Sequence, residues 1–446
     1  MPCNAALPIL VSGIFLFWAT SSSAEKTLSA PALAPAPTGP VYYVSPTGND
    51  ANAGTLSAPW RTIQKAANAT PAGGTAVLLD GTYEEGSVNF TRSGTANDRR
   101  ITIAAQNKWK AIVSSTSGCN PAFSINASYI TVKDVRFSVS PRNVQCGTYT
   151  STNVAIRAWA SNDPTPSNPS SGTVGFIADG VYVDAGTQRS DGIKSNQDFS
   201  IIQNSESGMD LEIFNNKNSI IRNNVVFGQN QYGISILAKG GVRNAQIYNN
   251  VVRNKVANGN GIYLGGYSCD ACFYDTSAKI EAYNSVAYNN VVINESSGSM
   301  AGLIFEGSKD SAFFNNIVIG GHVALMAGGH NSGFQYPTTN PTFKNNIVMC
   351  TAGSSGWSGS YSGTLAASYN NFHNCSNAPA QSFAVVGDPM FVNSRSDWRL
   401  QAGSPALNMG TSITSVAGYD GSPIDVSLDR NGVPYTAPWD LGIYNQ

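Results

Sequence analysis

Four carboxylates lie close together in a chain that is otherwise poor in charge. They are Asp191, Glu206, Asp210 and Glu212, whereas charged residues make up only 12% of the 446 residues, about half the usual share. Calcium binds several oxygen ligands at once, and neighbouring chain segments can supply them. The cluster therefore indicates a calcium site formed by these four residues. The alternative is that they are ordinary solvated charges on the face of a strand.

Two of these carboxylates belong to a series of short strands that begin with glycine. In residues 208–213 the side chains alternate between two faces, so Asp210 and Glu212 are expected to face outward. Similar strands at 192–194, 233–237, 261–264 and 302–306 add Lys194, Ser235, Tyr263 and Glu306 to the same outward row. The apolar neighbours are expected to face a core: Met209, Leu211, Ile213, Ile234, Ile236, Ile262, Leu264, Leu303 and Phe305. We expect Lys194 and Glu306 to contact a substrate on this row.

Two neighbouring polar residues, Asn-Asn or once Gln-Asn, recur at a similar place after these strands, and each such pair is called an Asn step here. Seven short apolar runs between residues 201 and 372 carry such a step, and the second Asn of the last six recurs every 25 to 40 residues. A period of this length indicates stacked units. Each unit is rich in β-branched and aromatic residues and has no helical periodicity, so it is a set of short strands. Asn tolerates left-handed bends and can bond to the Asn one coil away. The pattern predicts an all-β parallel β-helix of about ten or more coils.

The chain ends and the composition indicate where this protein works. An apolar run at 7–20 followed by small residues predicts a signal peptide at 1–24. An Ala- and Pro-rich stretch predicts a linker at 25–40, and the remaining residues, 41–446, are predicted to form one β-helix domain. A net charge of −1 gives no electrostatic basis for binding nucleic acid. We expect a secreted monomer that has no membrane span once the signal is removed.

The cysteines fit an exported protein. Apart from Cys3 in the predicted signal peptide, there are six. Two pairs lie about one coil apart and are predicted to form disulfides between adjacent coils: Cys119 with Cys146, and Cys350 with Cys375. Cys269 and Cys272 are predicted to form a local loop disulfide, with a redox or metal motif as the alternative.

Both ends of the predicted domain resemble a known group of proteins. Residues 41–83 resemble the opening of secreted right-handed β-helix polysaccharide lyases, in which a first strand leads to a capping helix, here near 62–69, and then to the first coil. Residues 387–406 and 439–442 resemble the C-terminal cap of the same group. The resemblance implies a right-handed parallel β-helix with an N-terminal capping helix and a C-terminal cap.

The carboxylate cluster resembles two lyase families. Residues 191–193 and 204–210 are similar to the calcium pattern of polysaccharide lyase family nine, DGF followed by NSDDGWD, with Ser207 in place of a carboxylate. Residues 260–266 are similar to its NGFKLGG, with Tyr263 at the position of the catalytic lysine. Residues 210–217 resemble the ExExxxxK pattern of family six, the alginate and chondroitin lyases, which ends here at Lys217. Lys239 lies near the position of that family's arginine.

These resemblances imply β-elimination from a uronic acid. The reaction needs the uronate carboxylate neutralised, a base for the proton at C5 and an acid for the leaving oxygen. Calcium can supply the first as a Lewis acid, and Lys217, Lys239 and Tyr263 are the candidates for the base. We therefore predict a secreted, calcium-assisted lyase that acts on an acidic polysaccharide. The alternatives are a hydrolase that uses Asp191 and Asp210 as acid and base, and a noncatalytic carbohydrate-binding surface protein.

Overall fold

The computed structural model describes residues 39–446, except for 116–119, 139–144, 147–148, 151–153, 160–164, 166, 168–171, 185–190, 229–234, 256–258, 270–271, 297–299 and 327–335. The predicted signal peptide and all but the last two residues of the predicted linker lie outside the described residues, as do Ile234 and Cys119 of the predicted Cys119–Cys146 pair. Residues Pro37–Gln446 form one unit.

Three long sheets make up this unit. The ten-stranded sheet contains β4 (Val88–Phe90), β7 (Phe123–Ile125), β12 (Ile156–Ala158), β15 (Asp191–Ser195), β18 (Asp210–Phe214), β21 (Ile236–Lys239), β25 (Asn260–Gly265), β29 (Ala301–Glu306), β33 (His322–Met326) and β36 (Trp357–Gly359). The twelve-stranded sheet contains β1 (Val41–Val44), β2 (Thr75–Leu78), β5 (Ile101–Ala105), β8 (Ile130–Lys133), β13 (Ile177–Asp179), β16 (Ile201–Gln203), β19 (Ile220–Arg222), β23 (Gln246–Tyr248), β27 (Val286–Tyr288), β31 (Ala312–Phe314), β34 (Thr342–Lys344) and β37 (Ala366–Ser368). The eleven-stranded sheet contains β3 (Gly81–Glu85), β6 (Ala111–Ser115), β9 (Arg136–Ser138), β14 (Tyr182–Val183), β17 (Glu206–Ser207), β20 (Val225–Gly228), β24 (Val251–Asn254), β28 (Val291–Asn294), β32 (Ile317–Ile319), β35 (Ile347–Met349) and β38 (Asn371–His373).

Smaller sheets complete the described part. A three-stranded sheet contains β22 (Val242–Arg243), β26 (Ala282–Tyr283) and β30 (Ser308–Lys309). Three antiparallel pairs are β10 (Gln145–Cys146) with β11 (Tyr149–Thr150), β39 (Phe391–Asn393) with β40 (Asp397–Leu400), and β41 (Ser415–Ala417) with β42 (Pro423–Asp425).

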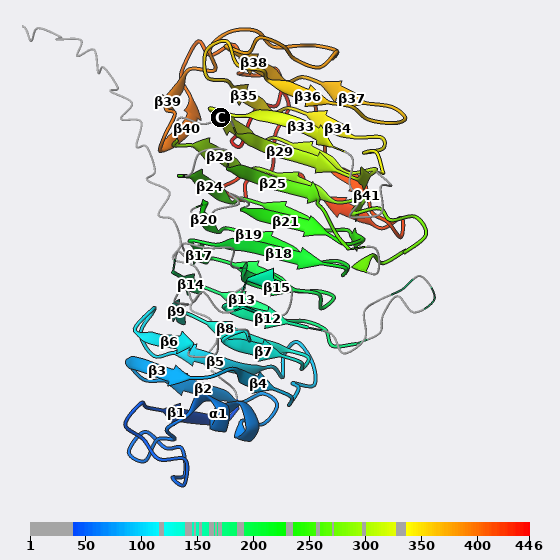
Figure 1. Ribbon diagram of the computed structural model, residues 1–446. Helices are drawn as coiled ribbons and strands as arrows, with labels where there is room; N and C mark the ends of the chain where they lie inside the picture. Colours follow the sequence, from blue (N-terminus) through cyan, green and yellow to red (C-terminus); the bar gives the residue numbers. More distant parts are fainter. Residues whose placement is uncertain are drawn as a thin grey trace, which may run out of the picture. The chain divides into compact units, whose positions relative to one another are not determined.

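The strands wind as a parallel β-helix, as predicted. Successive strands of one sheet, such as β15, β18 and β21, pair in parallel, and the chain visits the other two long sheets in between. Figure 1 shows these strands stacked coil upon coil. The predicted inward residues that the structure describes, including Leu211, Ile262 and Phe305, are buried in one continuous core. Alternation along each strand therefore leaves the intervening side chains on the outer face of the sheet.

The two residues of an Asn step have different structural roles. The first Asn of a step takes a left-handed backbone, as at Asn249 (φ 59°) and Asn289 (φ 54°). The second Asn forms a buried ladder in which each amide bonds to the next coil, running through Asn224, Asn250, Asn290, Asn316, Asn346 and Asn370. The sequence assigned Asn371 to the last rung, but Tyr369 takes the left-handed position there (φ 57°), which moves the rung to Asn370.

Removing one rung of this ladder should destabilise the fold. Asn290 Oδ1 accepts from Asn250 N and Nδ2, and Asn290 Nδ2 donates to Ile247 O. Asn290→Ala leaves these buried groups without partners, so we expect the free energy of unfolding to fall by about 3 kcal/mol. Urea unfolding measures this change. The exposed Asn126→Ala serves as control and should stay within about 0.5 kcal/mol of the parent; equal stability of both variants would contradict the structural role of the ladder.

The first coil is covered by the predicted helix. Helix α1 spans Ile63–Ala69, and its N-cap Thr62 accepts a hydrogen bond from Lys65 N through its side chain. Glu85 accepts from the N–H groups of Ile63 and Gln64 and so holds the helix start against β3. Ile63 and Ala66 are fully buried against the first strands. The helix therefore closes this end of the apolar core.

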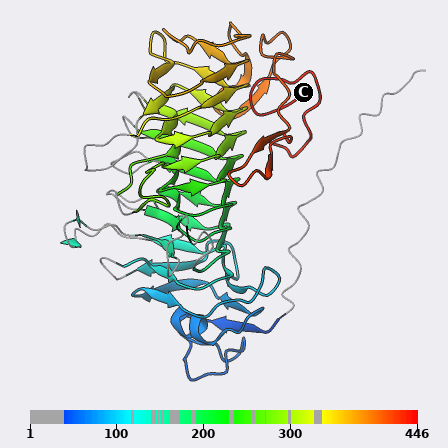
Figure 2. The same cartoon turned by 90° about the vertical axis from the view of Figure 1, so that its right-hand side faces the viewer.

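The C-terminal segment both follows the last coil and packs along the side of earlier ones (Figure 2). Ser382 and Val385 form parallel bridges to β37 and β38, so they extend the edges of two long sheets. Leu441 and Ile443 pack on Ile317 and Ile347, on the outer side of the eleven-stranded sheet. Left-handed Asn side chains donate to backbone carbonyls of this segment, as from Asn249, Asn289 and Asn345. In the described ranges, no helix is both long and apolar enough to cross a membrane.

Candidate active site

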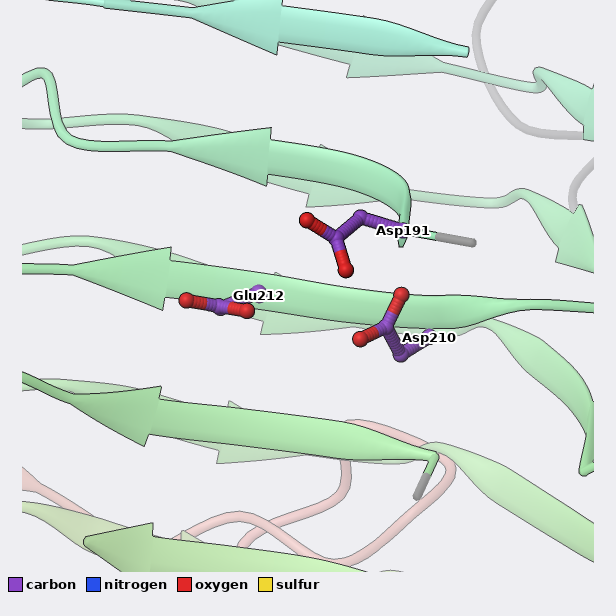
Figure 3. Close-up of side chains that lie close together, drawn as sticks. All are labelled: Asp191, Asp210 and Glu212. Atoms are coloured by element: carbon purple, nitrogen blue, oxygen red, sulfur yellow. The ribbon is translucent and has the colours of Figure 1, made fainter. Parts of the chain in front are cut away.

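Three of the predicted carboxylates meet on the outer face of two adjacent strands. Asp191 of β15 lies directly opposite Asp210 of β18, and Glu212 is two residues further along β18. Carboxylate oxygens of all three lie within 4.8 Å of one another (Figure 3). The strand pairing shifts register between Asp191 and Ile193. Gly192 permits this close approach, because a Cβ there would lie 2.6 Å from Asp210 O.

Asp210 is the carboxyl group of the three whose ionisation is most opposed by its surroundings. Its side chain is buried, and its Oδ1 accepts one hydrogen bond from Gly192 N at 2.9 Å. Burial, and then the charges of Asp191 and Glu212, raise the pKa of Asp210 well above its ordinary value, against that hydrogen bond and the charge of Lys194. A bound cation would relieve this repulsion. The sequence placed Asp210 on an exposed face, whereas neighbouring side chains cover it.

Two lysines balance Glu212. Lys194 Nζ lies 2.9 Å from Glu212 Oε1 and 3.9 Å from Asp191 Oδ2, and Lys239 Nζ lies 3.6 Å from Glu212 Oε1. Burial opposes ionisation of Glu212, but the two ammonium groups outweigh it and hold the pKa of this carboxyl below its ordinary value. Burial also opposes the charge on Lys194, yet Glu212 and Asp191 raise the pKa of its ammonium group. The partly buried Lys194 and the buried Glu212 therefore form an ion pair beside the Asp pair.

Near Lys239 lies the carboxyl group of Glu306, which is a weaker acid than an ordinary glutamate. Glu306 ends β29 and lies opposite Gly265 of β25. Burial, and then the charge of Glu281, raise the pKa of Glu306 to about 7, against the charge of Lys239. Gly265 and Gly266 leave no side chain between the two groups, and the stem of Lys239 packs over Gly266, where a Cβ would lie 2.8 Å from Lys239 Cδ. The Glu306 carboxyl, which lies near the Lys239 amine, can therefore hold or release a proton near neutral pH.

The outward row differs in part from the predicted one. Glu212 is in register with Leu237, which is in register with Tyr263. Ser235 is buried, and Glu306 is in register with Gly265, which is in register with Ala238. Tyr263 is in register with Ile304, which leaves Glu306 two residues further along β29, and a second register shift lies between Leu237 and Ala238. Alternation counted from the glycines could not show these shifts.

Three predicted site residues lie apart from the cluster. Glu206 belongs to β17 in the eleven-stranded sheet and is absent from the carboxylate group formed by described residues. Lys217 lies beyond β18, where its Nζ is 3.9 Å from Asp198 Oδ2. Tyr263 is buried among Leu237, Ile304 and Ala324, and burial and the charge of Glu306 raise the pKa of its hydroxyl. A raised pKa makes a tyrosinate harder to form.

Sequence reasoning missed two groups at this face. Glu281 is fully buried and accepts hydrogen bonds from Gly240 N, Ser268 N and Ser268 Oγ, which fixes the chain just after Lys239. Arg157 of β12 is in register with Lys194. Neither residue is part of a glycine-led strand, so the repeat that identified the other residues gave no signal for them.

Two disulfides lie in the described part of the chain. Cys269 is bonded to Cys272 in the loop after β25, and Cys350 is bonded to Cys375 across adjacent coils. Both bonds join the residues that the sequence paired.

The fold and the carboxylate–lysine cluster together define a β-helix protein with a candidate active site on one outer sheet face. The chain belongs to the family described as Pel9A-like, right handed beta helix region, whose model matches residues 42–316. The predicted family resemblance and the right-handed sense of the β-helix are therefore confirmed.

Short stretches of the chain match two curated relatives. Over 67 residues it is 46% identical to pectate lyase PEL9 of Emericella nidulans. This match covers 15% of this chain and 16% of that protein. Over 85 residues it is 34% identical to the uncharacterized protein YwoF of Bacillus subtilis, which covers 19% of this chain and 18% of that protein. The chain thus matches less than a fifth of the length of each relative.

Solved structures share the fold over most of the chain. The crystal structure of pectate lyase Pel9A is 16% identical, with a TM-score of 0.55, covering 92% of this chain and 97% of that one. The GH136 lacto-N-biosidase from Eubacterium ramulus is 12% identical, with a TM-score of 0.56, covering 77% and 67%. At these identities the likeness concerns the fold alone.

Proposed function

We propose that this protein is a secreted polysaccharide lyase that cleaves an acidic, uronic-acid-containing glycan by calcium-assisted β-elimination. The observation that carries the proposal is the convergence of Asp191, Asp210 and Glu212 within 4.8 Å on a Pel9A-like β-helix, beside two lysines. Membership of the family and the resemblance to lyase motifs support this class of reaction. Fold alone would not, because one scaffold carries many activities.

The three carboxylates suit calcium. Their oxygens are hard ligands that come from two adjacent strands, and Asp210 lies where two other negative charges raise its pKa. When bound, calcium neutralises the uronate carboxylate as a Lewis acid and so makes the proton at C5 more acidic. Glu206 is not part of this set, so we propose Asp191, Asp210 and Glu212 as the ligands.

Lys239 is the base that the geometry favours. It lies beside the cluster, whereas Lys217 pairs with Asp198 and Tyr263 has a raised pKa. In the neutral form its amine takes the C5 proton, the bond between C4 and the glycosidic oxygen breaks, and a C4–C5 double bond forms. Glu306, whose pKa is about 7, donates a proton to the leaving oxygen. Lys194 keeps the charge of Glu212 balanced throughout, and its contact with the substrate stays a prediction.

Export of the chain belongs to the same proposal. The Cys269–Cys272 and Cys350–Cys375 disulfides favour an oxidising compartment. The apolar run at 7–20 supports a signal peptide. We propose that residues 41–446 then act as one monomeric domain.

Glu306 should make stability depend on pH. Its pKa of about 7 exceeds the ordinary 4.5, so the folded chain holds this proton more tightly than the unfolded chain does. The free energy of unfolding must therefore fall as pH rises from 4.5 through about 7. Over this pH range, the free energy of unfolding of Glu306→Gln should fall by about 3 kcal/mol less than that of the parent. Urea unfolding on both sides of this range measures it, with the exposed Glu84→Gln as control; the same pH dependence in parent and Glu306→Gln would show that Glu306 ionises normally.

A screen of acidic polymers tests the proposed reaction. The purified chain is incubated with polygalacturonate, alginate and chondroitin sulfate, with calcium or with a chelator, and the ultraviolet absorbance of unsaturated product is followed. We expect product from at least one polymer, loss of product with chelator and recovery when calcium is returned. Absence of unsaturated product from every uronic-acid polymer, with calcium present, would overturn the proposal.

A further inference from the structure

An aromatic and cationic surface adjoins the carboxylate cluster on the side of the earlier coils. Arg157 of β12 is in register with Lys194 of β15, which is in register with Glu212 of β18. Arg157 is therefore two strands from Glu212 on the same outer face, about 10 Å away at the usual strand spacing. Just after β12, Trp159 stacks on Phe214 of β18, with ring centroids 6.1 Å apart and planes inclined by 17°.

Cations lie over both rings. Arg157 Cζ is 5.8 Å from the centroid of Trp159, and Lys194 Nζ is 5.1 Å from the centroid of Phe214. Lys194 is already engaged by Glu212 and Asp191. Arg157 differs, because in the described part of the chain it forms no ion pair with a carboxylate, and its buried Nε has no hydrogen-bond partner. Among the described residues, the Nε–H of this guanidinium is thus an unused donor beside a half-buried tryptophan.

This combination suits one unit of an acidic sugar chain. A guanidinium binds a carboxylate through paired N–H donors. An exposed indole offers flat apolar surface at little entropic cost, together with an N–H donor. An anionic pyranose presents both a carboxylate and an apolar ring surface, whereas a neutral sugar would leave the charge of Arg157 unmatched.

We propose that Arg157 and Trp159 form a binding subsite for an anionic sugar unit next to the unit held at the carboxylate cluster. The inference rests on the proposed function and extends it, since the glycan would then run across successive strands of the ten-stranded sheet, from β12 towards β29. Arg157 recognises the uronate charge of this neighbouring unit, and the Trp159–Phe214 pair supports its ring. The subsite selects for polymers with consecutive acidic units.

Affinity electrophoresis of the full chain tests the subsite without requiring cleavage. Migration is compared in gels that contain polygalacturonate, alginate or neutral dextran, with chelator present, for the parent, Arg157→Gln, Trp159→Ala and Arg99→Gln. Arg99 is exposed, so its variant makes the same change in net charge at a remote place. We expect Arg157→Gln to weaken binding to an acidic polymer about tenfold or more and Trp159→Ala to weaken it as well, while Arg99→Gln binds like the parent. None of the four should bind dextran.

Several outcomes would overturn the subsite. Equal retardation of Arg157→Gln and Arg99→Gln by every acidic polymer would do so, as would a parent chain that no acidic polymer retards. If Trp159→Ala fails to fold, as judged by thermal unfolding, Arg157→Gln alone decides. The two proposals fail separately. Selective loss of binding in Arg157→Gln, without any unsaturated product, would support the subsite and reject the lyase. Product formation with unchanged binding in Arg157→Gln would support the lyase and reject the subsite.

Discussion

Replacing Asp210 by Asn should lower lyase activity by about a thousandfold or more, because the change removes a ligand charge from the centre of the proposed calcium site. A Lewis-acidic metal contributes several kcal/mol to such a reaction, which corresponds to this factor. The fold should persist. The Asn side chain can still accept from Gly192 N, and one of three crowded negative charges disappears. Calcium titration by calorimetry and the rate of unsaturated product formation measure the two effects.

The exposed Asp98→Asn is the matched control, since it makes the same chemical change far from the site in sequence. It should keep full activity and calcium affinity. An Asp210→Asn variant that retains both would place the metal or the reaction elsewhere. If Asp210→Asn binds calcium normally but is inactive, Asp210 takes part in the reaction and is not a calcium ligand.

Lys239→Ala should cost about a hundredfold or more in kcat if Lys239 is the base, because that is the usual contribution of a positioned proton acceptor. Calcium affinity should change far less than in Asp210→Asn. The loss should be partly restored by added small primary amines, which can enter the space vacated over Gly266. Steady-state kinetics on the best polymer, with and without amine, give this result.

The same assay ranks the other base candidates. Lys217→Ala should keep activity within a few-fold of the parent, since Lys217 pairs with Asp198 outside the cluster. Tyr263→Phe should also retain most activity, because its hydroxyl has a raised pKa in a mostly apolar setting. A large loss in either variant together with an active Lys239→Ala would assign the base to that residue instead.

The architecture was largely readable from sequence because it repeats. Each coil contributes the same information, so Asn250, Asn290 and Asn316 independently indicate one ladder, and the structure confirms it. Burial of Leu211, Ile262 and Phe305 follows from simple alternation within glycine-led strands. The last rung was misplaced by one residue, since Tyr369 rather than an Asn takes the left-handed position.

The site was less readable because it depends on where the repeat breaks. The register shifts after Asp191 and after Leu237 decide which side chains face each other, and alternation alone cannot locate them. Glu206 is only four residues from Asp210 but belongs to another sheet, because the chain turns between β17 and β18. Burial, and then the charge of Glu281, raise the pKa of Glu306, and neither the depth of burial nor Glu281 is marked by a sequence motif.

Cleavage in heavy-oxygen water tests the central claim most directly. β-Elimination adds no water, so the products should carry a C4–C5 double bond at the new non-reducing end and no heavy oxygen from cleavage, as read by mass spectrometry of short oligosaccharides formed with calcium present. Products one water heavier, with heavy oxygen incorporated at the cleaved bond and no double bond, would contradict the lyase account and establish a hydrolase on this scaffold.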